Sequence, residues 1–154
     1  MGRVVVGIDP GETIGLAWVT YQHGEQIDRW HLVDAQATDV SVALTFLQMA
    51  VDQLRPDYDM TVVIEDYQSS GPLTKEAKLT IEQVGFFHGW FTARSNQPRN
   101  ILCKIVPPGR RQSRLEQARK LSPNGAVHAA RHGVDALAHV LKEIAKEEET
   151  NGSE

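Results

Sequence analysis

Residues 3–11 read RVVVGIDPG, and this stretch decides the fold that we expect. Its β-branched apolar residues are typical of a buried strand. Pro10 and Gly11 end the strand, so the carboxylate of Asp9 stands at a strand tip. An aspartate before Pro-Gly is also a common turn former, and for Asp9 alone the two interpretations are equally good.

A second apolar run ends in the same way. Residues 60–66 read MTVVIED, which predicts a central strand that ends near Glu65. A carboxylate at the end of a buried strand is unfavourable unless it is solvated, paired or bound to metal. Adjacent strand residues point to opposite faces, so we expect Glu65 rather than Asp66 to face a shared site. In isolation, the pair would be interpreted as an exposed strand end.

Periodicity predicts the other elements of the chain. β-branched and aromatic runs indicate strands over 14–21, 27–33 and 101–106. Apolar residues at helical spacing indicate helices over 40–54, 74–93, 110–121 and from Asn124 to Lys146. This order predicts an α/β fold with a five-stranded mixed sheet flanked by helices. We expect a single domain over residues 1–146 and an acidic, disordered tail over 147–154.

The last predicted helix carries a polar stripe. Residues 126–140 read AVHAARHGVDALAHV, and spacings of four, three and four place four side chains on one narrow face: His128, His132, Asp135 and His139. Apolar residues adjoin this face, so the helix presents imidazole and carboxylate groups to something buried. A single histidine here is more often a surface or core residue than a ligand, and the interpretation depends on all three stretches together.

Phosphodiester cleavage is a chemistry that needs such a grouping. Oxygen ligands suit Mg²⁺ and Mn²⁺, and two such ions can activate a water and stabilise the leaving oxygen. We expect Asp9, Glu65 and Asp135 to supply carboxylates. His132 is expected to be a further metal ligand or a proton shuttle, so these four residues are the candidate catalytic and metal-binding set.

Charge along the chain is uneven. The formal net charge is −4, yet nine basic residues face one acid between Arg94 and Arg131. A local basic stripe binds phosphate whatever the total charge, although taken alone it is more often a solvated face. Tyr67 is expected either to stack on a base or to pack in the core. The candidate DNA-binding residues are Tyr67, Lys75, Lys78, Arg110, Arg111, Arg114, Arg119 and Lys120.

Several classes of protein are excluded by composition. No apolar run approaches the roughly 20 residues that span a bilayer, and the N-terminus carries no apolar signal segment. The single cysteine, Cys103, cannot form an internal disulfide and is expected to be a packed thiol. We therefore expect a cytoplasmic protein without membrane contact, from a bacterial cell or encoded by a phage and acting in the host cytoplasm.

Three motifs in this order resemble the RuvC-like Holliday junction resolvases, in a divergent, phage-type form. They are GIDPG at 7–11, IED at 64–66 and HGVDALAHVL at 132–141. The resemblance places the family's acidic residues on Asp9 and Glu65 and its C-terminal pair on His132 and Asp135. It implies an RNase H-like fold, Mg²⁺ or Mn²⁺, a homodimer, and an endonuclease that resolves four-way DNA junctions by paired nicks.

Two other functions fit the same residues. One is an endonuclease for branched DNA or flaps in general, and the other is a catalytically silent RNase H-like module that binds nucleic acid. For the expected homodimer, the helix over 74–93 offers apolar and aromatic side chains that either form the interface or fill the core: Leu79, Phe86, Phe87 and Trp90, with Gln83 among them.

Overall fold

The computed structural model describes residues 2–22, 24–25, 27, 29–55, 57–66, 71–95, 100–108, 112–121 and 131–152 of the chain. Its strands are β1 (Gly2–Asp9), β2 (Thr13–Gln22), β3 (Arg29–Gln36), β4 (Asp59–Glu65) and β5 (Asn100–Val106). Its helices are α1 (Val40–Asp52), α2 (Lys75–Arg94), α3 (Gln112–Leu121) and α5 (Arg131–Gly152).

The five strands form one mixed sheet in the order β3-β2-β1-β4-β5. β1 is antiparallel to β2 and parallel to β4, and β2 is antiparallel to β3. β4 and β5 are parallel. The predicted α/β fold, a five-stranded mixed sheet flanked by helices, is therefore confirmed.

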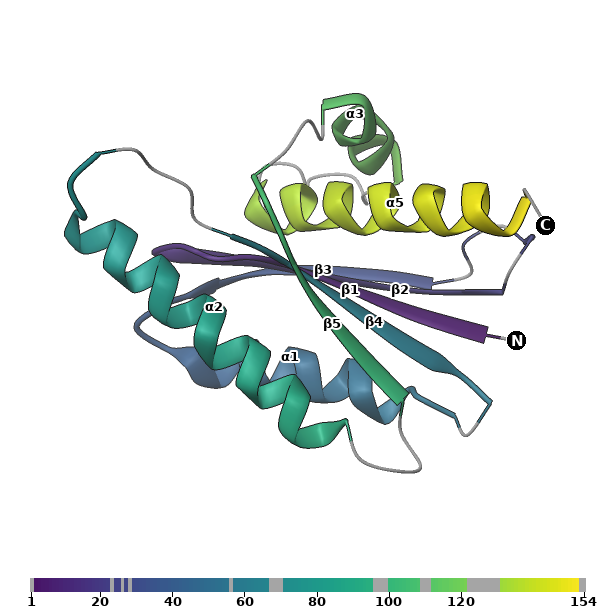
Figure 1. The fold of residues 1–154 in the computed structure, drawn as a ribbon, viewed down its shortest axis with the longest axis horizontal. Coiled ribbons are helices and arrows are strands. Elements are labelled where there is room, and N and C mark those ends of the chain that lie inside the picture. Colours follow the sequence, from purple (N-terminus) through teal and green to yellow (C-terminus); the bar gives the residue numbers. More distant parts are fainter. Residues whose placement is uncertain are drawn as a thin grey trace.

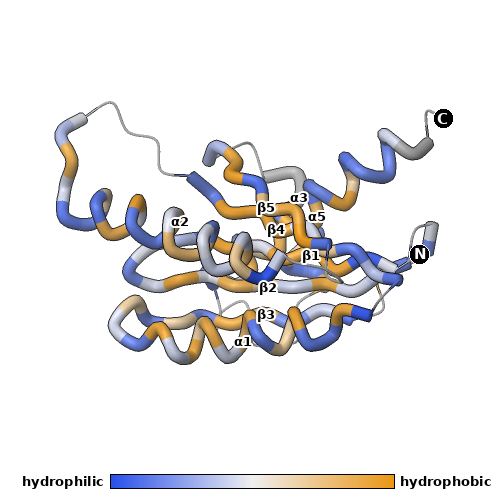
Figure 2. Tube along the Cα trace, turned by 60° about the horizontal axis from the view of Figure 1, so that its bottom comes forward, coloured by the Kyte–Doolittle hydropathy of each residue, from blue (hydrophilic) through white to orange (hydrophobic). Residues whose placement is uncertain are grey.

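Helices cover both faces of the sheet. α1 and α2 lie on one face, and α3 and α5 lie on the other (Figure 1). Alternate strand residues serve the two layers, because successive side chains point to opposite faces. Val4, Val6 and Ile8 of β1 pack in the core beneath α1 and α2, whereas Val5 packs in the core beneath α5. Figure 2 shows hydrophobic residues along the strands, whereas hydrophobic and hydrophilic residues alternate along the helices that cover them.

Most element boundaries lie within a few residues of the expected ones. α2 begins after Thr74, whose hydroxyl accepts a hydrogen bond from the backbone N–H of Ala77 at 3.1 Å. β3 is shifted toward the C-terminus from the predicted 27–33, because its register with β2 runs from Thr20↔Arg29 to Thr13↔Gln36. That register is a tertiary property, and no local pattern in the segment encodes it.

The expected disordered tail is wrong over residues 147–152. α5 continues to Gly152, past the predicted helix end at Lys146. The side chain of Glu147 accepts hydrogen bonds from Arg3 at 2.6 Å and from Tyr21 at 2.7 Å, so this acidic stretch is attached to the sheet. Residues 153–154 lie outside the described part of the chain.

Two smaller expectations can be compared with the structure. None of the described helices combines the length and the apolar character needed to cross a membrane. Cys103 is half-buried against the core beneath α1 and α2, and burial raises the pKa of its thiol to about 11. Burial thus disfavours the reactive thiolate form, and the predicted packed cysteine is confirmed.

Candidate metal centre

Two acidic residues end neighbouring parallel strands. Asp9 is the last residue of β1 and Glu65 the last residue of β4, and the pairing of Ile8 with Ile64 places them side by side in the sheet. Ile8 and Ile64 both pack beneath α1 and α2. Since side chains alternate along a strand, Asp9 and Glu65 both point to the face that α5 covers.

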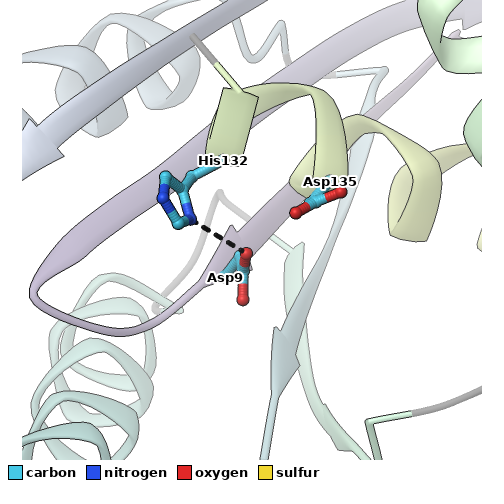
Figure 3. A group of neighbouring side chains, drawn as sticks. All are labelled: Asp9, His132 and Asp135. Carbon is cyan, nitrogen blue, oxygen red and sulfur yellow. Dashed lines mark ion pairs between the residues drawn. The ribbon is translucent and has the colours of Figure 1, made fainter. Parts of the chain in front are cut away.

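The first turns of α5 bring two further polar groups to Asp9. One ligand atom each from Asp9, His132 and Asp135 lie within 4.8 Å of one another, and all three residues are half-buried. The Nδ1 atom of His132 lies 3.9 Å from a carboxylate oxygen of Asp9. Figure 3 shows the two α5 side chains pointing toward Asp9 at the strand end. Three of the four predicted site residues are thus brought together.

Glu65 lies outside this group of three and contacts a different residue. Its Oε2 atom is 2.9 Å from Nε2 of His139, an imidazole that is only 3% exposed. The sequence had placed His139 on the polar stripe of the helix without giving it a role. Its position four residues after Asp135 was the signal in the sequence that could have pointed to a role. Its partner Glu65 could not be identified in this way, because the two residues are 74 positions apart. His128 lies outside the described residues.

α5 approaches the sheet closely enough to form this site because glycines face it. A Cβ atom on Gly15 would lie 2.0 Å from the carbonyl oxygen of His132, and one on Gly7 would lie 2.4 Å from that of Ala136. On the helix side, a Cβ on Gly133 would lie 3.1 Å from the backbone of Val33. Larger residues at the first two positions would push the start of α5 away from Asp9.

Asp34 of β3 holds the start of α5. Its carboxylate accepts hydrogen bonds from the backbone N–H groups of Gly133 at 2.7 Å and His132 at 3.4 Å. A carboxylate at a helix N-terminus also interacts favourably with the helix dipole. Asp34 pairs in the sheet with Gly15, which in turn pairs with Asp9, so one row of residues supports both halves of the site.

Gln83 of α2 holds the turn that follows Asp9. Its amide accepts a hydrogen bond from the N–H of Gly11 at 2.8 Å and donates one to the carbonyl of Gly11 at 2.9 Å. The sequence had assigned Gln83 to a possible dimer interface, but this side chain is buried in that contact instead. Sequence reasoning missed Asp34 and Gln83 because single polar residues in a strand and a helix carry no local signal of such contacts.

The expected DNA-binding residues are placed only in part. Lys75 and Lys78 are exposed at the start of α2, which follows β4, and Arg119 and Lys120 are exposed on α3. α3 lies beside α5 on the same face of the sheet (Figure 1). Tyr67, Arg110 and Arg111 lie outside the described residues, as does the side chain of Arg114.

The donor set of the site suits a hard divalent cation. Two carboxylates and one imidazole lie within 4.8 Å of one another, and all three residues are only partly buried. Carboxylate oxygens are the ligands that Mg²⁺ and Mn²⁺ favour, and imidazole suits Mn²⁺ better than Mg²⁺. The group is therefore chemically able to hold one of these ions.

The chain is similar to several solved structures, two of which are of the same protein. One is Thermus thermophilus RuvC in complex with a Holliday junction substrate, with a TM-score of 0.52 and 16% sequence identity over 96% of each chain. The other, also of Thermus thermophilus RuvC, has a TM-score of 0.51 and 18% identity over 90% of this chain and 91% of that one. No family model and no curated protein sequence matches the chain. At these identities the likeness concerns the fold, and the chain has the RNase H-like fold of RuvC.

Proposed function

We propose that this protein is a metal-dependent endonuclease that cuts four-way DNA junctions. The observation that carries the proposal is the meeting of Asp9, His132 and Asp135 within 4.8 Å at the edge where parallel strands end. Open α/β sheets bind ligands outside the carboxyl ends of their strands. The fold shared with Thermus thermophilus RuvC, which was solved with a Holliday junction, supports the same substrate class.

In this proposal Asp9 and Asp135 hold a divalent cation through carboxylate oxygens, with His132 as a nitrogen ligand. Glu65, on the neighbouring strand and the same sheet face, supplies oxygen for a second ion. Mg²⁺ or Mn²⁺ bound there would supply Lewis-acid activation of the attacking water and stabilisation of the leaving oxygen. The α5 helix and the sheet shield one side of these groups, so the DNA backbone approaches from the open edge.

The exposed basic residues would hold the phosphates that the acidic site repels. Lys75 and Lys78 follow the carboxyl end of β4, and Arg119 and Lys120 follow that of β5. When a basic side chain that neutralises one phosphate of duplex DNA is removed, the log–log salt slope of binding falls by about 0.9. Changing both Arg119 and Lys120 to alanine should therefore flatten the salt dependence of junction binding. The matched control replaces two exposed lysines at the far end of α5, Lys142 and Lys146, and should leave the slope unchanged.

A homodimer would supply the two active sites that paired nicks across a two-fold junction require. α2 is the proposed interface, because Ile81 and Phe86 are 45% and 48% exposed, a large fraction for apolar side chains. Phe87 is buried in the core and is not available for this contact. Sedimentation of the wild type and of Phe86→Ser at micromolar concentration tests the interface, and a wild-type monomer that still makes paired nicks would contradict it.

The experiment that tests the function is cleavage of end-labelled DNA with Mg²⁺ or Mn²⁺. Four-way, three-way, flap and linear duplex substrates are compared, with Glu65→Gln and, as a control on the same strand, Asp59→Asn. We expect paired nicks in the four-way junction, abolished in the Glu65 variant and retained in the Asp59 variant. Equal cutting of flaps would favour the general branched-DNA nuclease. Junction binding without cutting in either metal would favour the silent module.

A further inference from the structure

His139 is a deeply buried polar side chain on the polar stripe of α5, between buried apolar residues of the helix. It is 3% exposed, and its chain neighbours Ala138 and Val140 are both fully buried. A buried polar group that lacks a hydrogen bond costs about 1–3 kcal/mol. The imidazole meets this requirement with the carboxylate of Glu65, whose Oε2 atom lies 2.9 Å from Nε2.

The chemistry of the two groups fixes the direction of this bond. The ionised form of Glu65, which is the form that binds a cation, only accepts hydrogen bonds, so in this form Nε2 of His139 carries the hydrogen and donates it. The Glu65 side chain is 12% exposed, and the helix fixes the position of the donor. The bond therefore restricts the orientation of the carboxylate at the end of β4, on the same sheet face as Asp9.

We propose that His139 is a positioning residue that orients the carboxylate of Glu65 for a divalent cation, an inference that rests on the proposed function. His132, Asp135 and His139 follow one another at spacings of three and four on α5, so one helix face carries two metal ligands and the donor that orients a third. Carboxylates that bind metal are generally held by such hydrogen bonds, and removal of the partner costs about 10–100-fold in metal affinity or activity.

The next turn of α5 offers a matched control. Glu143, four residues after His139, is 6% exposed and forms an ion pair with Lys104 of β5. It is thus a second buried polar contact between the same helix and the neighbouring strand. Neither member of this pair belongs to the candidate metal centre, so a change there affects packing and charge without reorienting Glu65.

The test measures Mn²⁺ binding to the full chain, by titration calorimetry and by the electron paramagnetic resonance signal of free Mn²⁺. His139→Leu keeps bulk but removes the donor, and we expect Mn²⁺ affinity to fall by about 10–100-fold. His139→Gln places an amide N–H near the position of Nε2 and should restore most of that affinity. Glu143→Gln should keep the wild-type affinity. Urea unfolding of every variant shows whether folding itself has changed.

Two results would overturn the inference: wild-type Mn²⁺ affinity in folded His139→Leu, or an affinity in folded His139→Gln as low as that in His139→Leu. Both would leave the proposed function intact, provided that the wild type binds Mn²⁺ and cuts junction DNA. A wild type that does neither would overturn the proposed function together with the inference. The binding measurement on the wild type therefore separates the two failures.

Discussion

The two ends of α5 contact the sheet through polar clusters that differ in how their carboxylates are partnered. At the N-terminal end lies the acid cluster, made of Asp9, Glu65, His132, Asp135 and His139. At the C-terminal end lies the clamp, made of Arg3, Tyr21, Thr61 and Glu147. Both clusters join α5 to β1 and β4, and the clamp also includes Tyr21 of β2.

The clamp matches its carboxylate with strong donors. Glu147 accepts hydrogen bonds from the guanidinium of Arg3 at 2.6 Å and from the hydroxyl of Tyr21 at 2.7 Å, and Arg3 also donates to Thr61 at 2.9 Å. Burial by itself lowers the pKa of Arg3, but the charge and hydrogen bond of Glu147 outweigh it and the pKa is raised. Burial, with the hydrogen bond to Glu147, raises the pKa of Tyr21 far above its ordinary range.

The acid cluster instead brings carboxylates toward one another. Asp9 and Asp135 each offer an oxygen within the same 4.8 Å group, and the partners of Asp9 and Glu65 include imidazoles, whose charge depends on protonation. Like charges at this distance repel, whereas a divalent cation would turn the repulsion into binding. The clamp thus satisfies its carboxylate within the protein, whereas the acid cluster has the composition that the proposed metal site requires.

The largest expected effect is the loss of cleavage in Asp9→Asn and Asp135→Asn. An amide keeps the shape of the side chain but removes the charge that holds the cation. Removing a hydrogen-bond partner of a metal ligand costs up to about 100-fold in activity. Loss of the ligand charge itself should therefore lower the cleavage rate by more than this factor. Unfolding in urea with a chelator should show no loss of stability, because the change also removes like-charge repulsion. Single-turnover cleavage of a labelled junction measures the first effect, and near-normal cutting by either variant would remove that residue from the site.

The converse expectation applies to the clamp. Arg3→Met should lower the free energy of unfolding by about 2–3 kcal/mol, because Glu147 then lacks its charged hydrogen-bond partner in a half-buried position. Mn²⁺ affinity should remain that of the wild type wherever the variant is folded. Urea unfolding measures the free energy of unfolding, and titration calorimetry measures the Mn²⁺ affinity. A variant that is folded but binds Mn²⁺ weakly would contradict the expectation and show that the two clusters are coupled through α5.

A substitution that alters the packing of the start of α5 should affect the acid cluster and leave the clamp unchanged. Gly15→Ala places a methyl group 2.0 Å from the carbonyl oxygen of His132, so the start of α5 must move, at a cost of about 1–3 kcal/mol. Cleavage and Mn²⁺ affinity should both fall, while the clamp is unaffected. The control is Gly85→Ala in α2, where an added Cβ meets no atom within 4 Å. That change should stabilise the chain slightly, by about 0.5–1 kcal/mol, and leave Mn²⁺ affinity unchanged.

The smallest expected effect is a pH dependence of the clamp. The pKa of Tyr21 is raised in the folded chain above its ordinary value of 10.0, so the folded state keeps this proton longer than the unfolded state does. The stability contributed by the group is therefore complete below pH 10.0 and disappears as the pH rises beyond it. Tyr21→Phe should cost about 1–2 kcal/mol at neutral pH and show a weaker alkaline loss. The measurement is the urea midpoint of the wild type and of Tyr21→Phe from about pH 8 to pH 11. If the two midpoints fall in parallel as the pH rises, the expectation is wrong.

Much of the candidate site was accessible from local patterns. The apolar runs before Asp9 and Glu65 identified two strand ends, and helical spacing put His132 and Asp135 on one face of a helix. The same patterns could not assign a role to His139, because its partner Glu65 is 74 residues away. The predicted end of the last helix was also wrong, since the run of glutamates after Lys146 has the composition of a tail, whereas Glu147 is attached to the sheet by contacts with Arg3 and Tyr21, which are distant in the sequence.

The sequence by itself determined the strands, the helices and the candidate acids, because period-two and helical spacing are properties of neighbouring residues. Only the tertiary structure decided which acids meet. The pairing of Ile8 with Ile64 sets Asp9 beside Glu65, and the close approach of α5 over Gly7 and Gly15 brings His132 and Asp135 to Asp9 while His139 reaches Glu65. These contacts depend on strand register and helix packing, which are set by the whole core and by no single segment.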